Sequence, residues 1–197
     1  MVKDIIESKI LPEGALQLIC GSANGILDHV ESEDVVTFTG SASTGKMLKS
    51  HPRLIDKAVP FNMEADSLNC SVLGSDAKPG TAEFDLFIKG VRTEMTVKAG
   101  QKCTAIRRII VPEELAEDVQ IALGKALSKT TMGDPQVEGV RMCALAGQEQ
   151  VTEVREKIEL LSKSQEIVYG NLDNFEVTGA DKNKGAFLSP ILFRNDD

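Results

Sequence analysis

Apolar residues along the chain recur with two kinds of spacing, one typical of helices and one typical of short buried strands. Spacings of three and four residues predict helices, and continuous apolar runs that end at glycine or proline predict strands. The main predicted helices cover residues 2–10, 82–98, 112–129 and 148–162. The predicted strands cover residues 16–20, 35–39, 69–74, 107–112 and 166–170, with a final extended run at 186–193.

Two shorter elements complete this pattern. Residues 24–30 predict a short helix or turn, and residues 46–51 predict a helix that Ser43, Thr44 and Gly45 would cap. Strands that alternate with helices indicate a parallel sheet with right-handed crossovers and helices on its faces. We therefore expect a Rossmann-like α/β fold of three layers, αβα. The most irregular stretch, residues 66–81, is the candidate domain boundary.

Composition and charge narrow the class of protein. The chain has 197 residues, 42% of them hydrophobic, so it can form a globular core. Its net charge of −8 disfavours nucleic acid and acidic membrane surfaces as partners. No apolar run approaches the roughly 20 residues of a membrane span, and the first residues do not resemble a signal peptide. These features predict a cytoplasmic protein.

The segment VVTFTGSASTGKM resembles a phosphate-binding loop but departs from that motif at one decisive position. Gly40, Gly45 and Lys46 match the G-x-x-x-x-G-K pattern between a strand and a helix. The hydroxyl residue that would hold magnesium is replaced by Met47, which disfavours a P-loop nucleotidase. Two interpretations stay open: a glycine turn whose N–H groups bind a phosphate at the helix N-terminus, or a simple tight turn.

Four cysteines are spread along the chain, with no Cys-x-x-Cys pair and no cysteine–histidine cluster, so no metal site is expected. Cys20, Cys70 and Cys143 lie in or near apolar segments and are expected in the core. The pattern by itself also favours a buried structural role for Cys103. The alternative for Cys103 is a reactive thiol, because Lys102, Arg107 and Arg108 are close in sequence. Glu64 by itself is typical of a solvated loop carboxylate.

Several segments taken in order carry a more specific signal. They are FTGSASTG, an isolated Glu64, GQKCTAIRRIIVP, MGDP and GAFLSPILF. In this order the chain resembles the aldehyde dehydrogenase superfamily over almost its whole length. NMEADSLNCSVLG together with GQKCTAIRRIIVP is most similar to a bifunctional subfamily of phenylacetate degradation, in which a MaoC-like hydratase is fused to the dehydrogenase.

The resemblance implies two catalytic residues. Cys103 matches the nucleophile, which would add to the aldehyde carbon to give a thiohemiacetal. Transfer of the hydride from that carbon to a nicotinamide would then leave the acyl group on the cysteine as a thioester. Its backbone N–H would form part of the oxyanion hole. Glu64 matches the general base that activates the hydrolytic water. Around Glu64 the chain departs from the usual family pattern, since Ala65, Asp66 and Ser67 replace Leu-Gly-Gly.

The resemblance also implies a site for NADP or NAD. Gly40, Ser41 and Gly45 match the turn beneath the pyrophosphate of the cofactor, and Thr39 lies towards its nicotinamide. Ala65, next to the expected base, is assigned to the same site.

Other family segments have no counterpart here, among them the Pro-Trp-Asn stretch that supplies an oxyanion-hole asparagine. The resemblance therefore implies an internal fragment. Residues 1–67 would be the second half of a split cofactor-binding domain, and residues 68–197 would be a catalytic domain incomplete at its C-terminus. The parent would be a homo-oligomer with a fused hydratase domain, oxidising an aldehyde from ring cleavage that is linked to CoA. The alternatives are a CoA-acylating dehydrogenase and a non-catalytic domain, and the fragment alone is expected to be inactive.

Overall fold

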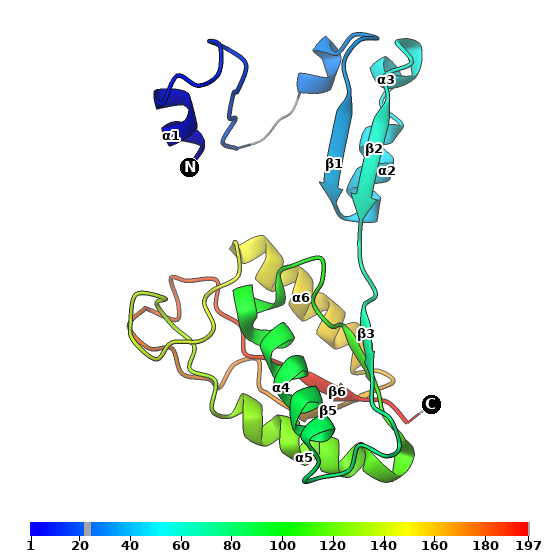
Figure 1. Cartoon of the computed structure of the whole chain (residues 1–197), viewed down its shortest axis with the longest axis vertical. Coiled ribbons are helices and arrows are strands. Elements are labelled where there is room, and N and C mark those ends of the chain that lie inside the picture. The colour runs from blue at the N-terminus through cyan, green and yellow to red at the C-terminus, as the bar shows by residue number, and fades with distance from the viewer. Residues whose placement is uncertain (22–24, 197) are drawn as a thin grey trace. The chain divides into compact units, whose positions relative to one another are not determined.

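The chain forms two compact units, Met1–Asp66 and Ser67–Asp197, in a computed structural model (Figure 1). The structure describes residues 1–21 and 25–196. Each unit has its own helices and its own paired strands. Among the described residues, no helix combines the length and the apolar character needed to cross a membrane.

The first unit is built on two parallel strands, β1 (Val36–Gly40) and β2 (Phe61–Ala65), which pair over their full length. The connection between them consists of helices α2 (Ala42–Lys49) and α3 (Pro52–Asp56). The strand predicted at residues 35–39 and the helix predicted after it at residues 46–51 are confirmed. Strand β2 was not predicted, because only its first residue and Met63 are strongly apolar.

Capping residues set the limits of both helices. The Ser41 side chain accepts a hydrogen bond from the Thr44 N–H, so α2 begins before the predicted cap at residues 43–45. His51 caps α3, with Pro52 at its first position, where the missing proline N–H costs nothing. Helix α2 therefore ends at Lys49, before the predicted end at residue 51, and a new helix starts at Pro52.

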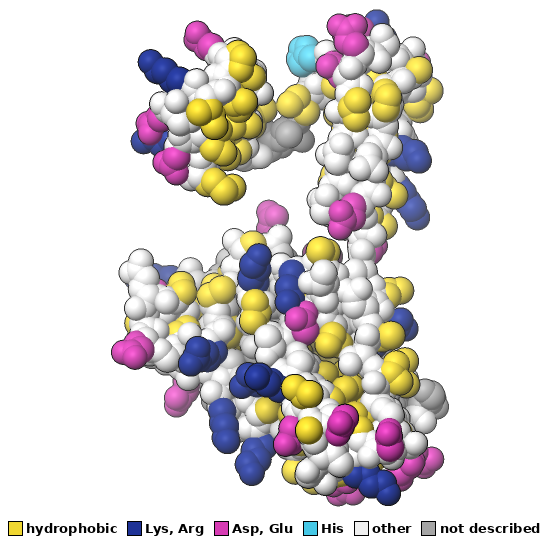
Figure 2. Space-filling model, in the orientation of Figure 1, with side chains coloured by type: hydrophobic (Ala, Val, Ile, Leu, Met, Phe, Trp, Pro, Cys, Tyr) yellow, Lys and Arg dark blue, Asp and Glu magenta, His cyan; other side chains and the backbone are white. Residues whose placement is uncertain are grey.

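The N-terminal part of this unit differs most from prediction. Helix α1 ends at Glu7 (Val2–Glu7), and η1 (Ile26–His29) confirms the predicted short helix. Residues 16–20 were predicted as a buried strand, and this is wrong: they form no strand, and Leu18 and Ile19 are each about 60% exposed. The physical reason is that no described strand lies alongside to pair with them. Figure 2 shows hydrophobic side chains on the surface of this segment.

The core of the second unit is formed by two helices against a parallel strand pair. Strands β3 (Cys70–Val72) and β4 (Arg108–Ile110) pair in parallel, and helix α4 (Ala82–Thr96) connects them, followed by the 3-10 turn η2 (Val97–Gly100). The 3-10 turn η3 (Glu113–Leu115) leads into α5 (Ala116–Leu127). The packed side chains are Leu73, Phe84, Ile88, Val91, Leu115, Val119 and Leu123.

The C-terminal part adds helix α6 (Gln148–Leu161) and the antiparallel strands β5 (Glu166–Tyr169) and β6 (Leu192–Arg194). The predicted helices of this unit and its strands are therefore present. The strands of the described residues form three two-stranded sheets, two of them parallel, rather than one continuous sheet. Each described strand therefore pairs with one other strand only.

The cysteines are more accessible than predicted. Cys20, Cys70 and Cys103 are exposed, and Cys143 is half-buried; none is in a disulfide. The expectation of core cysteines was wrong, because Cys20 lies in no strand and Cys70 lies in a strand that pairs with β4 alone. Among the described residues, no group of three or more His, Cys, Asp or Glu is arranged to hold a metal ion.

Candidate functional site

The predicted cofactor residues gather at the carboxyl end of the β1–β2 pair. In the parallel register Thr39 is opposite Glu64, and Gly40 is opposite Ala65. The carbonyl of Gly40 also accepts a hydrogen bond of 3.2 Å from the Asp66 N–H, which extends the pairing by one residue. Glu64 is exposed on this strand end and not in a loop.

The N-terminus of α2 follows directly and already attracts an anionic group. Asp66 Oδ1 accepts a hydrogen bond of 3.2 Å from the Ala42 N–H, and Ser41 caps the same turn. A helix N-terminus carries partial positive charge, which explains the position of this carboxylate. Gly45 is buried on the face of α2 that contacts the strands, where an added Cβ would overlap Met63 Sδ. The glycine therefore permits close packing of α2 on β1 and β2.

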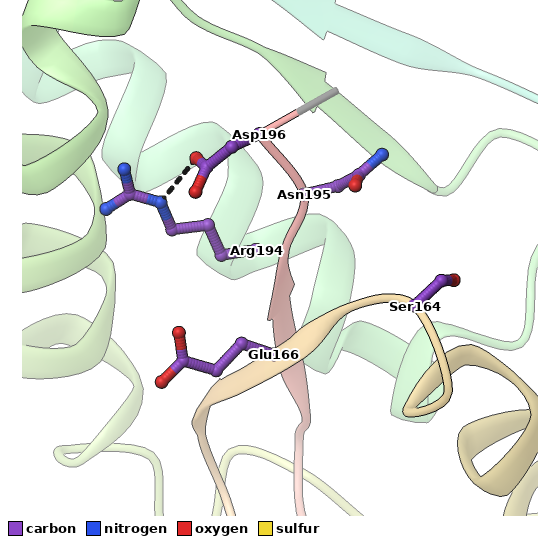
Figure 3. A pocket seen from close by; sticks show the side chains of 5 residues that line it. All are labelled: Ser164, Glu166, Arg194, Asn195 and Asp196. Carbon is purple, nitrogen blue, oxygen red and sulfur yellow. Dashed lines mark hydrogen bonds and ion pairs between the residues drawn. The ribbon is translucent and has the colours of Figure 1, made fainter.

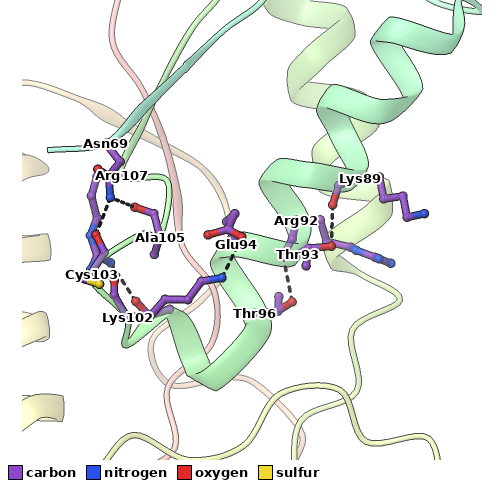
Figure 4. A network of polar contacts seen from close by, with 11 residues as sticks. Asn69, Lys89, Arg92, Thr93, Glu94, Thr96, Lys102, Cys103, Ala105 and Arg107 are labelled. Atoms are coloured by element: carbon purple, nitrogen blue, oxygen red, sulfur yellow. Dashed lines mark hydrogen bonds and ion pairs between the residues drawn. The ribbon is translucent and has the colours of Figure 1, made fainter. Parts of the chain in front are cut away.

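Cys103 lies in the second unit, in a tight turn between η2 and β4 (Figure 4). The turn is closed by a hydrogen bond of 3.2 Å from the Ala105 N–H to the Lys102 carbonyl. The side chain of Asn69 donates to two of its carbonyls, at 2.6 Å to Cys103 and 3.1 Å to Ala105. The cysteine is thus exposed in a segment that side chains hold in place.

Arg107 binds the same segment from its other end. Its Nη1 donates to the Gly100 carbonyl and its Nη2 to the Lys102 carbonyl, both at 3.0 Å. Arg108 instead donates to the Leu68 carbonyl at 3.3 Å. The two neighbouring arginines thus have different partners, in keeping with the alternation expected along a strand.

Lys102, next to the cysteine, is paired with Glu94 of α4. Their Nζ and Oε1 atoms are 2.8 Å apart, and each side chain is only 24% exposed. The second carboxylate oxygen, Glu94 Oε2, is buried and has no hydrogen-bond partner among the residues that the structure describes. On the other side of the motif, Gln101 Oε1 accepts from the Ala146 N–H at 2.9 Å. Both residues before Cys103 are therefore fixed by contacts beyond the motif.

The structure brings together the predicted residues of the first unit but leaves one pairing open. Glu64 belongs to the first unit and Cys103 to the second. Their approach, needed for a base and a nucleophile, stays a prediction. Sequence reasoning missed Asn69 and Glu94 altogether, since neither carries a motif of its own. It considered Arg107 only as a nearby charge.

A shallow polar pocket elsewhere contains none of the predicted residues (Figure 3). It is lined by Ser164, Glu166, Arg194, Asn195 and Asp196 near the end of the β5–β6 pair. Arg194 Nε is 2.7 Å from Asp196 Oδ1, and this hydrogen bond raises the pKa of the guanidinium. The pocket is open to solvent and includes none of the residues predicted for catalysis or cofactor binding.

Two further pKa shifts report local structure. The hydrogen bond from Lys57 and the charge of Arg53 lower the pKa of Glu31, despite an opposing effect of desolvation. Burial raises the pKa of Tyr169 above its ordinary value of 10.0. Neither group lies among the predicted site residues.

Parallel strand pairs joined by helices, with a glycine turn at one carboxyl end, place the chain among α/β proteins with Rossmann-like topology. A family model described as "Aldehyde dehydrogenase family" matches residues 1–197. The chain therefore belongs to the aldehyde dehydrogenase family.

Relatives in sequence agree. The chain is 44% identical over 192 residues to 3,4-dehydroadipyl-CoA semialdehyde dehydrogenase of Aromatoleum evansii, covering 98% of this chain and 37% of that protein. It is 28% identical to 1-pyrroline-5-carboxylate dehydrogenase of Oceanobacillus iheyensis, with the same coverage. The chain thus spans little more than a third of the curated relatives it matches.

Solved structures agree on the fold. Apo betaine aldehyde dehydrogenase of Staphylococcus aureus matches 99% of the chain with a TM-score of 0.83 at 23% identity, and the chain covers 38% of it. A structure of the same enzyme in complex with NAD+ matches 83% of the chain with a TM-score of 0.72 at 22% identity, 31% of that chain being covered. The α/β class and the fold predicted from the sequence are confirmed.

Proposed function

We propose that this chain is part of an NAD(P)-dependent aldehyde dehydrogenase in which Cys103 is the nucleophile. The observation that carries the proposal is the state of Cys103. Its thiol is free and exposed, and side chains hold the surrounding turn by its carbonyls. An accessible nucleophile on a supported turn is what covalent catalysis on an aldehyde needs.

The chemistry then assigns each residue a task. The Cys103 thiolate adds to the aldehyde carbon, and its backbone N–H donates a hydrogen bond to the oxygen that becomes negative. Departure of the hydride with its electron pair leaves an acyl thioester on Sγ. Glu64 takes a proton from a water molecule that attacks this thioester, which releases the acid and the cysteine thiolate.

NAD or NADP supplies the hydride acceptor when bound. The N-terminus of α2 at the end of β1 fits the pyrophosphate of such a group because a helix N-terminus favours an anion, and the cofactor would displace the Asp66 carboxylate that the Ala42 N–H binds here. We assign Gly40, Ser41 and Gly45 to the turn beneath the pyrophosphate, Thr39 to the nicotinamide side, and Ala65 to the same cofactor site. The assignment of the first unit as half of a cofactor-binding domain, and of the second as catalytic domain, is part of the same proposal.

For the substrate we propose a CoA-linked semialdehyde. The support is the identity of 44% to 3,4-dehydroadipyl-CoA semialdehyde dehydrogenase of A. evansii. We extend the proposal to a cytoplasmic, homo-oligomeric parent protein of phenylacetate degradation with a fused hydratase domain. On this proposal, the 197-residue chain alone is inactive, because it spans 37% of that relative.

The test uses the whole protein that contains this chain, with 3,4-dehydroadipyl-CoA semialdehyde as substrate. We expect Cys103→Ala to abolish formation of reduced cofactor, while Cys143→Ala, at a half-buried cysteine, serves as matched control and stays active. Turnover by Cys103→Ala would refute the proposal.

Glu64→Gln separates the two halves of the reaction. We expect a burst of reduced cofactor equal to the enzyme concentration, followed by slow turnover, because the thioester forms but its hydrolysis lacks the base. A normal steady-state rate would show that Glu64 is not the base. If that rate also required CoA, the CoA-acylating alternative would replace hydrolysis.

A further inference from the structure

We propose that Arg107 and Asn69 are positioning residues that fix the backbone N–H of Cys103 for its hydrogen bond to the substrate oxygen. The inference rests on the proposed function, since it assumes that Cys103 is the nucleophile. It adds two residues that neither the sequence motif nor the comparisons assign.

Two side chains each donate hydrogen bonds to two of the carbonyl groups around Cys103. Four of them, between Gly100 and Ala105, accept hydrogen bonds from only two side chains (Figure 4). Arg107 binds the carbonyls of Gly100 and Lys102, and Asn69 binds those of Cys103 and Ala105. This pair of side chains, the clamp, therefore acts on both sides of the nucleophile.

Peptide geometry connects these carbonyls to the N–H group. The Lys102 carbonyl and the Cys103 N–H belong to one planar trans peptide, so they point in opposite directions. A guanidinium that holds the carbonyl at 3.0 Å thereby fixes the direction of the N–H. The bond is charge-assisted and also polarises the peptide, which strengthens the N–H as a donor.

The N–H groups in question are available. Cys103 and Thr104 occupy the central positions of the turn closed by Ala105 and Lys102, and within the described chain their N–H groups donate to no protein acceptor. Cys103 is exposed, and the proposal places the substrate oxygen at its N–H. The clamp thus binds the carbonyls of the turn and leaves the N–H groups of Cys103 and Thr104 free within the described chain.

The two side chains start from a rigid base. Asn69 directly precedes β3 and Arg107 directly precedes β4, and these strands pair in parallel. The Asn69 carbonyl accepts hydrogen bonds from the N–H groups of Arg107, at 2.9 Å, and Arg108, at 3.2 Å. The clamp is therefore anchored at the start of the β3–β4 pair, outside the turn that contains Cys103.

Arginine suits this task better than lysine. Its planar fork presents two nitrogens in fixed geometry, whereas a lysine ammonium is a single point charge that does not span two carbonyls. Arg107→Lys keeps the charge and removes the fork. Arg108→Lys is the matched control, because Arg108 is its exposed neighbour and binds the Leu68 carbonyl outside the turn.

The test measures kcat and KM in the whole protein with 3,4-dehydroadipyl-CoA semialdehyde and NAD+. Loss of one oxyanion-hole donor lowers kcat by about 100- to 1,000-fold. A donor that is present but poorly oriented keeps part of this effect, so we expect Arg107→Lys to lower kcat about tenfold. We expect the KM for NAD+ to stay unchanged, and both constants to stay unchanged in Arg108→Lys.

An unchanged kcat in Arg107→Lys would overturn the proposal, and so would equal losses in both lysine variants. A rise in the KM for NAD+ alongside the loss in kcat would also count against it, because general damage would then explain the result. If Arg107→Lys fails to fold, Asn69→Asp takes its place, since it keeps the shape but removes both donated bonds. A normal kcat in Asn69→Asp overturns the proposal, and a lowered one supports it.

Cys103→Ala distinguishes the two proposals. If it is active, the proposed function fails regardless of the arginine variants. If it is inactive while Arg107→Lys has a normal kcat, only the positioning role fails.

Discussion

Gly133 offers a quantitative test of the second unit, because its backbone leaves no room for a side chain. Its φ is +157°, and an added Cβ would overlap the Thr178 carbonyl oxygen and lie 2.8 Å from its carbon. Backbone atoms cannot move aside as a flexible side chain can. Gly133→Ala must therefore open the bridge that joins residue 133 to residue 178.

The magnitude follows from two contributions. A conformation reserved for glycine costs an alanine about 1–3 kcal/mol. Opening the bridge removes hydrogen bonds from the Asp134 N–H to the Thr178 carbonyl, 2.9 Å, and from the Thr178 N–H to the Met132 carbonyl, 2.8 Å. Each such bond contributes about 1 kcal/mol to stability. We expect Gly133→Ala to lower the free energy of unfolding by about 3–5 kcal/mol in total.

Two other glycines of this unit serve as controls. Gly139 has a φ of +88° but open space around it, so Gly139→Ala carries only the cost of left-handed backbone, about 1–2 kcal/mol. Gly90 lies within α4 and also has open space, so Gly90→Ala should stabilise by up to about 1 kcal/mol through helix propensity. The three variants are thus expected to rank in stability with Gly90→Ala highest and Gly133→Ala lowest. Only Gly90→Ala is expected to be more stable than the unsubstituted chain.

The assay is urea unfolding followed by tyrosine fluorescence. The chain has one tyrosine and no tryptophan, and Tyr169 lies in β5, so the signal reports the second unit alone. If Gly133→Ala and Gly139→Ala differ by less than about 1 kcal/mol, the close approach to Thr178 does not limit this position and the reasoning is refuted.

Three further predictions concern single groups. Ser41→Ala removes the cap on Thr44 and should reduce the stability of the first unit by about 1 kcal/mol, measured by far-ultraviolet circular dichroism during urea unfolding. Lys102→Met leaves the half-buried Glu94 carboxylate without its partner, and we expect a loss of about 1–3 kcal/mol in the tyrosine-monitored assay. Burial raises the pKa of Tyr169, so the folded chain holds the phenol proton more tightly than the unfolded chain does. The contribution of the protonated Tyr169 phenol to stability should be complete below pH 10 and be lost as the pH rises through the raised pKa. Absorbance titration at alkaline pH should show that the phenol ionises above pH 10.0.

The helices of the second unit could be predicted from sequence because each has its own apolar stripe and its own limits. Thr81 caps α4, and Phe84, Ile88 and Val91 recur at the helical period on its buried face. Such signals extend over three or four residues within one element, so they can be recognised without knowing which element packs against it. Each motif of the family resemblance is equally local, and their order along the chain is also a property of the sequence, so the resemblance could be stated from the residues alone.

The tertiary structure decided which side chains are exposed and which side chains bind one another. Residues 16–20 have the apolar character of a buried strand, yet no described strand pairs with them. Whether a strand is buried depends on the elements beside it, which its own sequence pattern does not specify. Cys70 is exposed although its strand β3 pairs with β4, because pairing within a sheet does not by itself cover the side chains on the faces of the strands. Asn69 and Arg107 meet the turn of Cys103 only because β3 pairs with β4 in one particular register. The sequence thus determined the elements and the candidate nucleophile, and the pairing of distant strands determined which side chains hold that nucleophile in place.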